Sequence, residues 1–255
     1  MLATVPAVSL GLALLFVSPW LPREALSALR TASAGWVQPT LVCAGIAGLV
    51  QLALLFGPGR QAPRDVGWRA SQVPVALCAG LALWLLMQAP ALLALAPSRP
   101  PAWQAGWSQG AGVALGPLVA QLAATALVEE TVFRGWLWPQ LASRLASHLV
   151  PRAASLLAAG VSQAVFALLH LPVLLAGDGA VAGTLLVLFA TGLVFVGVYA
   201  ATGNLFVAVV VHALGNAPTL LLAPPPGAPA PTMLLLAGTL AIVAVAAVRR
   251  RRARA

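Results

Sequence analysis

The stretch 127-LVEETVFRGWLWPQL-141 places two adjacent carboxylates, Glu129 and Glu130, and a nearby arginine, Arg134, in otherwise apolar sequence. The whole chain of 255 residues has only five acidic residues. An ionised side chain at the centre of a bilayer costs at least about 2.5 kcal/mol, so such residues face the interior of a helix bundle and mark a functional site. This stretch therefore bears both on the fold and on the chemistry.

The composition is that of a membrane protein. Hydrophobic residues make up 61% of the chain and charged residues 7%, and the mean hydropathy is +0.96, whereas a soluble domain would be about 25% charged. The fourteen basic residues are all arginine and give a net charge of +9. They lie mostly between the apolar segments and at the C-terminus, where they set membrane topology. We therefore expect the lipid bilayer as a partner and no nucleic acid.

Apolar segments of the length needed to cross a bilayer, about 20 residues, occur eight times. Helices satisfy their own backbone hydrogen bonds in lipid, so we predict an all-α, polytopic membrane protein of about eight transmembrane helices. The segments are roughly 3–19, 37–57, 73–96, 111–138, 153–175, 181–201, 205–222 and 232–248.

The connections between these segments predict the orientation. We expect arginine-containing loops at 19–30 and 57–69, proline-rich connectors at 97–101 and 224–231, and a tight turn at 202–204. With eight spans, most loop arginines and the arginine tail 249–254 fall on one side, which the positive-inside rule assigns to the cytoplasm. Both termini would then be cytoplasmic. The arginine-only, alanine-rich composition suggests a bacterial protein of the inner or plasma membrane.

Helical spacing separates the roles of the two glutamates. Glu130 and Arg134 are four residues apart, so they can form an ion pair on one face. Glu129 is turned about 100° away, and no arginine lies at the matching offset. Glu129 is thus the carboxylate available for proton transfer.

Two later segments supply the other ionisable residues. His170 ends 166-FALLH-170, where Phe166 lies one turn earlier, and His212 begins 212-HALGN-216, where Asn216 lies on the same face. Histidine can shuttle protons or ligate a metal, and asparagine can donate to an oxyanion. Because three segments contribute, we expect one shared polar pocket.

Each motif also has a purely structural interpretation. Taken alone, Glu130 and Arg134 form a structural ion pair. His212 and Asn216 can instead make a helix-packing hydrogen bond, and His170 can be a satisfied interior histidine. The combination of the three motifs on one very apolar chain favours function over this interpretation.

Several hydrolytic mechanisms lack their residues here. The sequence has no H-E-x-x-H zinc motif and no G-x-S-x-G nucleophile turn, and Asp65 and Asp178 both fall in expected loops. A glutamate with two histidines and an asparagine remains. This set can activate water and stabilise a tetrahedral oxyanion, with or without a metal ion.

The motifs 129-EETVFR-134, 166-FALLH-170 and 212-HALGN-216 resemble the EExxxR, FxxxH and HxxxN motifs of the CPBP family (CAAX proteases and bacteriocin-processing enzymes, also called Abi). This family includes the type II CAAX prenyl endopeptidases. The resemblance covers roughly residues 111–222 and implies an eight-helix membrane endopeptidase.

The resemblance also implies roles for the residues. Glu129 would be the general base, His170 would orient the water, and His212 and Asn216 would stabilise the oxyanion. The supporting residues would be Glu130, Arg134 and Phe166.

The use of a metal ion stays open at this stage. The family is often labelled metalloprotease, and a metal-free glutamate mechanism is also argued for it. Glu129, His170 and His212 are adequate Zn²⁺ ligands, but their spacing does not demand a metal.

The chain divides into three regions on this reading. Residues 1–110 hold three generic spans, 111–222 the catalytic core, and 223–255 the last span and the arginine-rich tail. His170 lies too far along a straight fifth span to meet His212, which lies about 11 Å from the start of its own segment. The fifth helix must therefore begin outside the membrane, tilt strongly or be broken.

We predict an endopeptidase that cuts near the cytoplasmic face. Its substrate would be a prenylated C-terminus, a bacteriocin leader or another membrane-tethered peptide, and the sequence selects neither among these nor an oligomeric state. The alternatives are a non-catalytic membrane scaffold or immunity protein and a proton-coupled transporter. Clustered polar residues disfavour the transporter, which needs polar groups along the depth of several helices.

Overall fold

The computed structural model describes residues 1–95 and 102–253, and within these ranges the chain is helical, without strands. The all-α prediction is confirmed. The α-helices are α1 (Thr4–Val17), α2 (Arg23–Ala32), α3 (Pro39–Phe56), α4 (Val73–Leu93), α5 (Ala111–Ala120), α6 (Ala126–Glu129), α7 (Trp138–Leu145), α8 (Pro151–Leu168), α9 (Leu171–Leu175), α10 (Val181–Thr202), α11 (Leu205–Asn216) and α12 (Pro231–Arg252). The π-helical segments are η4 (Gln121–Thr125) and η5 (Glu130–Leu137), and the short 3₁₀ segments are η1 (Pro63–Val66), η2 (Ala70–Gln72) and η3 (Ala105–Gln109).

Six of the eight predicted spans are helical stretches long and apolar enough to cross a membrane. They are Pro39–Phe56, Pro63–Leu93, Ala111–Leu145, Pro151–Leu175, Val181–Thr202 and Pro231–Arg252. The first and seventh are shorter than predicted, because α1 has 14 residues and α11 has 12, or roughly 21 and 18 Å. The seventh ends at Asn216 because Pro218 disfavours helical backbone at Ala217.

The predicted loop 19–30 is wrong from Arg23 onward, where the chain forms α2. Glu24 lies in the first turn of α2 and Arg30 in the last, so both charges oppose the helix dipole favourably. Arginine in this segment therefore belongs to an amphipathic helix instead of a loop. The predicted connector 97–101 and the last arginine of the tail, Arg254, lie outside the described residues.

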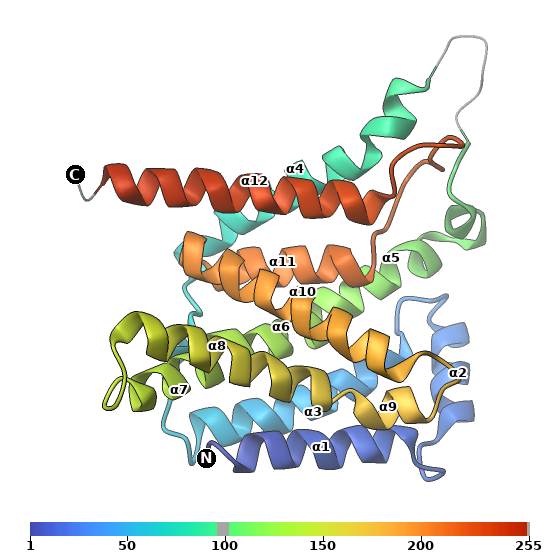
Figure 1. The fold of residues 1–255 in the computed structure, drawn as a ribbon. Coiled ribbons are helices and arrows are strands. Elements are labelled where there is room, and N and C mark those ends of the chain that lie inside the picture. The colour runs from blue at the N-terminus through green and yellow to red at the C-terminus, as the bar shows by residue number, and fades with distance from the viewer. Residues whose placement is uncertain (96–101, 254–255) are drawn as a thin grey trace.

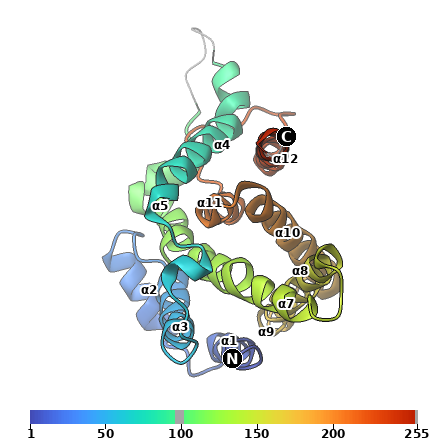
Figure 2. The same ribbon diagram turned by 90° about the vertical axis from the view of Figure 1, so that its left-hand side faces the viewer.

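The helical stretch from α5 to α7 runs through the middle of the bundle (Figure 2). On one side α3 packs against η4, and α1 packs against α3 and α9. On the other side α11 packs against η4, α6 and η5, while α10 packs against α8, α11 and α12. The stretch that carries Glu129 and Glu130 thus contacts both halves of the chain.

Both termini lie at the same end of the bundle (Figure 1), as an even number of crossings predicts. The arginine-containing segment 57–69, the turn 146–150 and the end of α12 also lie at this end. So does the predicted turn between α10 and α11. Gly203 there has φ of +66°, and the Asn204 side chain accepts a hydrogen bond from Phe206 N at 3.0 Å, which caps α11.

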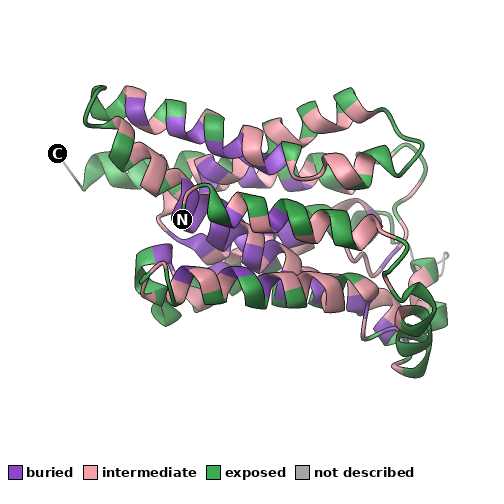
Figure 3. Ribbon diagram, turned by 90° about the horizontal axis from the view of Figure 1, so that it is seen from below, coloured by how far each residue is buried: buried purple, intermediate pink, exposed green. Residues whose placement is uncertain are grey.

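Buried residues follow the inward sides of the helices and exposed residues the outward sides (Figure 3). Many of the exposed residues are large and apolar, for example Leu49 at 71% and Leu186 at 67% exposure. An apolar outer surface of this extent fits lipid as the surrounding solvent. The chain is therefore a polytopic integral membrane protein.

Candidate active site

Residues 127–141 lie in one continuous helical stretch, which changes from α-helix to π-helix between Glu129 and Glu130. π-Helical turns are rare and occur frequently at functional sites. The straight α-helix assumed from the sequence is therefore wrong here, although the two carboxylates do differ in environment. The Glu130 side chain is fully buried, whereas 24% of the Glu129 side chain is exposed.

The predicted ion pair between Glu130 and Arg134 is present. Arg134 Nη1 lies 3.2 Å from Glu130 Oε1, and both side chains are fully buried. This nitrogen makes no directed hydrogen bond, so the contact is mainly coulombic. The guanidinium also lies 4.5 Å from the ring centroid of Phe166, and its Nη2 donates to Gly192 O at 3.4 Å. Such contacts offset part of the desolvation cost of a buried cation.

Close approach of α10 to Arg134 requires glycine at position 192. A Cβ atom there would lie 2.6 Å from Gln163 Oε1 and 3.1 Å from Arg134 Nη2. Gln163 and its neighbour Ser162 are also fully buried, and Ser162 Oγ donates to Phe133 O at 3.2 Å. Sequence reasoning missed these residues, because isolated Gln, Ser and Gly carry no motif.

His212 joins the two carboxylates. Its Nδ1 lies 2.8 Å from Glu130 Oε1, and its Nε2 lies 3.5 Å from Glu129 Oε2. An ionised carboxylate only accepts hydrogen bonds, so His212 Nδ1 donates and Nε2 is directed at Glu129. The ring of Phe195 stacks on the imidazole at 4.6 Å between centroids. The link from Glu130 to His212 was not predicted, since the two residues are 82 positions apart.

His170 lies at a break between α8 and α9. A broken fifth helix is one of the three geometries that the sequence required. His170 Nδ1 donates to Phe166 O at 2.8 Å, because a carbonyl oxygen can only accept. The Phe166 ring centroid lies 4.8 Å from that of His170 and 6.4 Å from that of His212. Phe166 thus packs against both imidazoles and the Arg134 guanidinium.

Asn216 lies at the exposed end of α11. Its Nδ2 donates to Gln121 Oε1 at 3.1 Å, so Gln121, in the first π-helical segment, positions the amide. The sequence contained no signal for this partner, because a glutamine in an apolar segment is not a motif by itself.

Two cavities meet at Glu129, and Thr125, Phe166 and His170 line both of them as well. The larger, of about 550 Å³, lies among α10, α11 and α12 and is also lined by His212 and Asn216. The four predicted catalytic residues therefore share one cavity.

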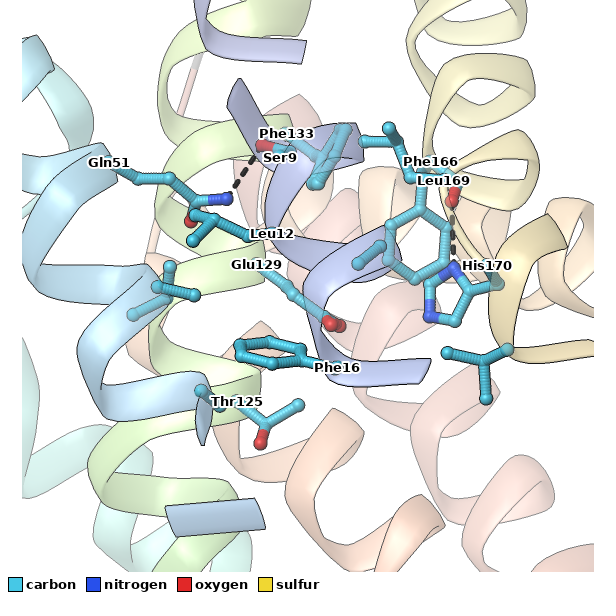
Figure 4. A pocket seen from close by; sticks show the side chains of 15 residues that line it. Ser9, Leu12, Phe16, Gln51, Thr125, Glu129, Phe133, Phe166, Leu169 and His170 are labelled. Carbon is cyan, nitrogen blue, oxygen red and sulfur yellow. Dashed lines mark hydrogen bonds between the residues drawn. The ribbon is translucent and has the colours of Figure 1, made fainter. Parts of the chain in front are cut away.

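The smaller cavity, of about 180 Å³, is closed by α1 and α3. Figure 4 shows Glu129 and His170 at this cavity, with Leu12 and Phe16 of α1 beside them. Gln51 Nε2 on α3 donates to Ser9 Oγ on α1 at 2.6 Å at the same wall. The first spans, treated as generic from the sequence, thus form part of the site.

Glu129, His170 and His212 were predicted to be the zinc ligands if the protein uses a metal ion. Within residues 1–95 and 102–253, no three His, Cys, Asp or Glu side chains form a group that could hold a metal ion. Glu129, His170 and His212 all lie in this part of the chain, and His212 Nδ1 is engaged by Glu130. In this arrangement the three residues do not fit a zinc ion.

Comparison with known proteins supports the family resemblance. A family model described as "Type II CAAX prenyl endopeptidase Rce1-like" matches residues 111–218, which include all seven predicted site residues. The match confirms the resemblance predicted from the three motifs. It indicates a membrane-embedded protease of the CAAX endopeptidase type. No match was found among curated proteins or solved structures.

Proposed function

We propose that the protein cleaves a peptide bond of a membrane-tethered substrate with water activated by Glu129, since residues 111–218 match the model of the Rce1-like type II CAAX prenyl endopeptidases. The single observation that carries this proposal is the arrangement of the two glutamates around His212. Glu130 is buried and paired with Arg134, whereas Glu129 reaches the cavities and faces His212 Nε2.

In the first step Glu129 takes a proton from water, and the resulting hydroxide attacks the carbonyl carbon of the scissile bond. We assign stabilisation of the oxyanion that forms to the Asn216 amide and to His212 Nε2, which donates when both ring nitrogens carry a proton. Glu129 then returns the proton to the departing amine as the C–N bond breaks. The products are a carboxylic acid and an amine, and the carboxylate of Glu129 is regenerated.

The remaining residues position these groups. Glu130 holds His212 Nδ1, and Arg134 holds Glu130. His170, oriented by the Phe166 carbonyl, presents its other nitrogen toward the space that the water would occupy. Gln121 holds Asn216. We place this core at residues 111–222, with α1 and α3 as an added wall.

Apolar substrates could reach the site between α10 and α12. The larger cavity is lined there by Val187 and Met233, which are 60% and 65% exposed, so it extends to the lipid-facing surface. A prenylated or otherwise membrane-anchored peptide could therefore approach Glu129 from the bilayer. Val187 and Met233 lie near the starts of α10 and α12, whereas the arginines lie where α12 ends. With the arginine-rich end in the cytoplasm, this placement does not support the predicted cut near the cytoplasmic face.

The decisive experiment replaces Glu129 by Gln and by Ala in the purified full chain and measures cleavage of a quenched library of membrane-anchored peptides. Loss of a general base lowers turnover by about 10²- to 10⁴-fold. Glu24→Gln, on α2 outside the site, is the matched control and should retain wild-type turnover. Unchanged turnover in both Glu129 variants would remove this residue from the mechanism, whereas absence of cleavage by the wild-type chain would favour the scaffold role.

We derive every step from protein groups, because the candidate ligands do not form a three-residue metal group. Chelation of divalent metals before the assay is therefore expected to leave turnover unchanged. Loss of turnover on chelation, restored by added Zn²⁺ alone, would contradict this mechanism and require His170 or His212 to move.

A further inference from the structure

A separate cavity of about 620 Å³ lies at the arginine-rich end of the bundle, away from Glu129. It is formed where α4 and α11 begin and where α10 and α12 end. Its polar lining consists of Ser71, Gln72, Asn204, Arg249 and Arg250, besides Thr202. No catalytic residue of the proposed mechanism lines it, so it is separate from the proposed active site.

The two arginines give this cavity a local positive charge. All five acidic residues of the chain are described, and none forms an ion pair with Arg249 or Arg250. Arg250 donates to Ala200 O near the C-terminus of α10 and lies against Gly203. Arg250 is thereby held in place, whereas the charge of both residues is left for an anion.

The rest of the cavity is apolar and runs along α4 and α12. Val75, Val207, Ile242 and Val245 line it, and Val75 and Val245 are 62% and 53% exposed. An exposed apolar groove on a membrane-spanning bundle is covered by lipid chains. Cations at one end of an apolar groove match the shape of a phospholipid that carries a negative headgroup.

Gln72 lines the cavity, but its polar atoms are held within the protein. Its Oε1 atom is buried and has no hydrogen-bond partner, while its Nε2 donates to Gly203 O at 3.0 Å. The unpartnered oxygen can only accept a hydrogen bond. The protein's own atoms cover this oxygen, so it is not a contact for a molecule in the cavity.

We propose that this cavity binds an anionic phospholipid, such as a phosphatidylglycerol. The phosphate lies between Arg249 and Arg250, and an acyl chain follows α4 and α12. The lipid is a structural ligand, and the proposal does not depend on the proposed peptidase activity.

The site is connected to the catalytic residues through α11. Asn204 lines the cavity, caps α11 and donates through Nδ2 to Gln72 O at 2.9 Å. His212 follows eight residues later, about 12 Å along the helix. A bound lipid would therefore hold the starts of α4 and α11 against the ends of α10 and α12. Binding to the folded state would raise the thermal stability of the protein by mass action.

The test measures the melting temperature of the delipidated full chain in detergent after addition of phosphatidylglycerol, of phosphatidylcholine with the same acyl chains, or of soluble glycerol phosphate. Phosphatidylglycerol alone should raise the melting temperature, by about 5 °C at saturation. An equal rise with phosphatidylcholine would overturn the charge recognition. An equal rise with glycerol phosphate would overturn the assignment to a lipid.

Matched variants locate the effect. R249Q/R250Q should abolish the rise caused by phosphatidylglycerol, whereas R251Q/R252Q, which removes two charges of the same helix outside this cavity, should retain it. Ala246→Phe, which fills the apolar part and keeps both arginines, should also abolish the rise. Equal loss in the two double variants would show attraction to the tail in general and overturn the site. Retention of the rise in Ala246→Phe would overturn the acyl-chain placement.

Discussion

The two walls of the cavity at Glu129 differ in chemistry. The wall from residues 111–218 carries ionisable groups that hold one another, with Glu130 between Arg134 and His212. The wall from α1 and α3 is neutral, and its polar contact is the hydrogen bond between Gln51 and Ser9. The ionisable groups, which must be held in a fixed orientation, therefore come from the wall that contains the family motifs. The other wall contributes side chains such as Phe16, which shape the cavity.

The largest effect is expected from Arg134→Met in the ionisable wall. Removing the cation leaves Glu130 buried beside His212, and breaking one partner of a buried ion pair costs about 3–5 kcal/mol. The free energy of unfolding, measured by denaturant titration in detergent, should fall by this amount. Arg144→Met, on the exposed part of α7, is the matched control and should change it by less than about 0.5 kcal/mol. A similar small change in Arg134→Met would show that the pair does not hold this wall together.

An intermediate effect is expected from Phe16→Ala in the neutral wall. The smaller cavity would enlarge next to Glu129, so a substrate with a bulkier side chain should be accepted about 10-fold better relative to a small one. The measurement is the ratio of kcat/KM for two anchored peptides that differ at one position. Leu14→Ala, on the exposed face of the same helix, should leave this ratio unchanged. An unaltered ratio in Phe16→Ala would mean that α1 does not contact the substrate.

The smallest effect is expected from Gln51→Leu. The hydrogen bond to Ser9 Oγ is lost, which lowers the free energy of unfolding by about 1 kcal/mol. Ser9→Ala should have a similar effect, and the double variant should cost less than the sum of the two. Turnover should stay near the wild-type value. A drop in kcat comparable with that of Glu129→Gln would instead place this pair in the chemistry and end the distinction between the walls.

Local spacing accounts for the parts that could be predicted. Glu130 and Arg134 are four residues apart and are paired as predicted. Phe166 and His170 are likewise four apart, and their rings are in contact. The break at His170 was one of three geometries predicted from length, because a straight helix could not bring this residue to His212. These inferences need only the rise and the repeat of a helix.

Long-range contacts account for the parts that were missed. The partners of Glu130 and Asn216 lie 82 and 95 positions away, and helix spacing carries no information across such distances. The π-helical turn at Glu130 was missed as well, since it depends on packing against neighbouring helices more than on residue type. The helix α2 was assigned to a loop because arginine was used only as a marker of topology.

The sequence alone determined that the chain is an all-α membrane protein and which side chains are the candidates for its chemistry, because the cost of placing a charge in lipid makes every intramembrane Glu, His and Arg conspicuous. The tertiary structure decided which of these groups meet. Glu130 was paired by spacing with Arg134 alone, but packing of α11 against the central stretch made it the partner of His212 as well. The tertiary structure also decided that α1 closes the cavity, since apolar helices look alike in sequence and differ only in the neighbours they pack against.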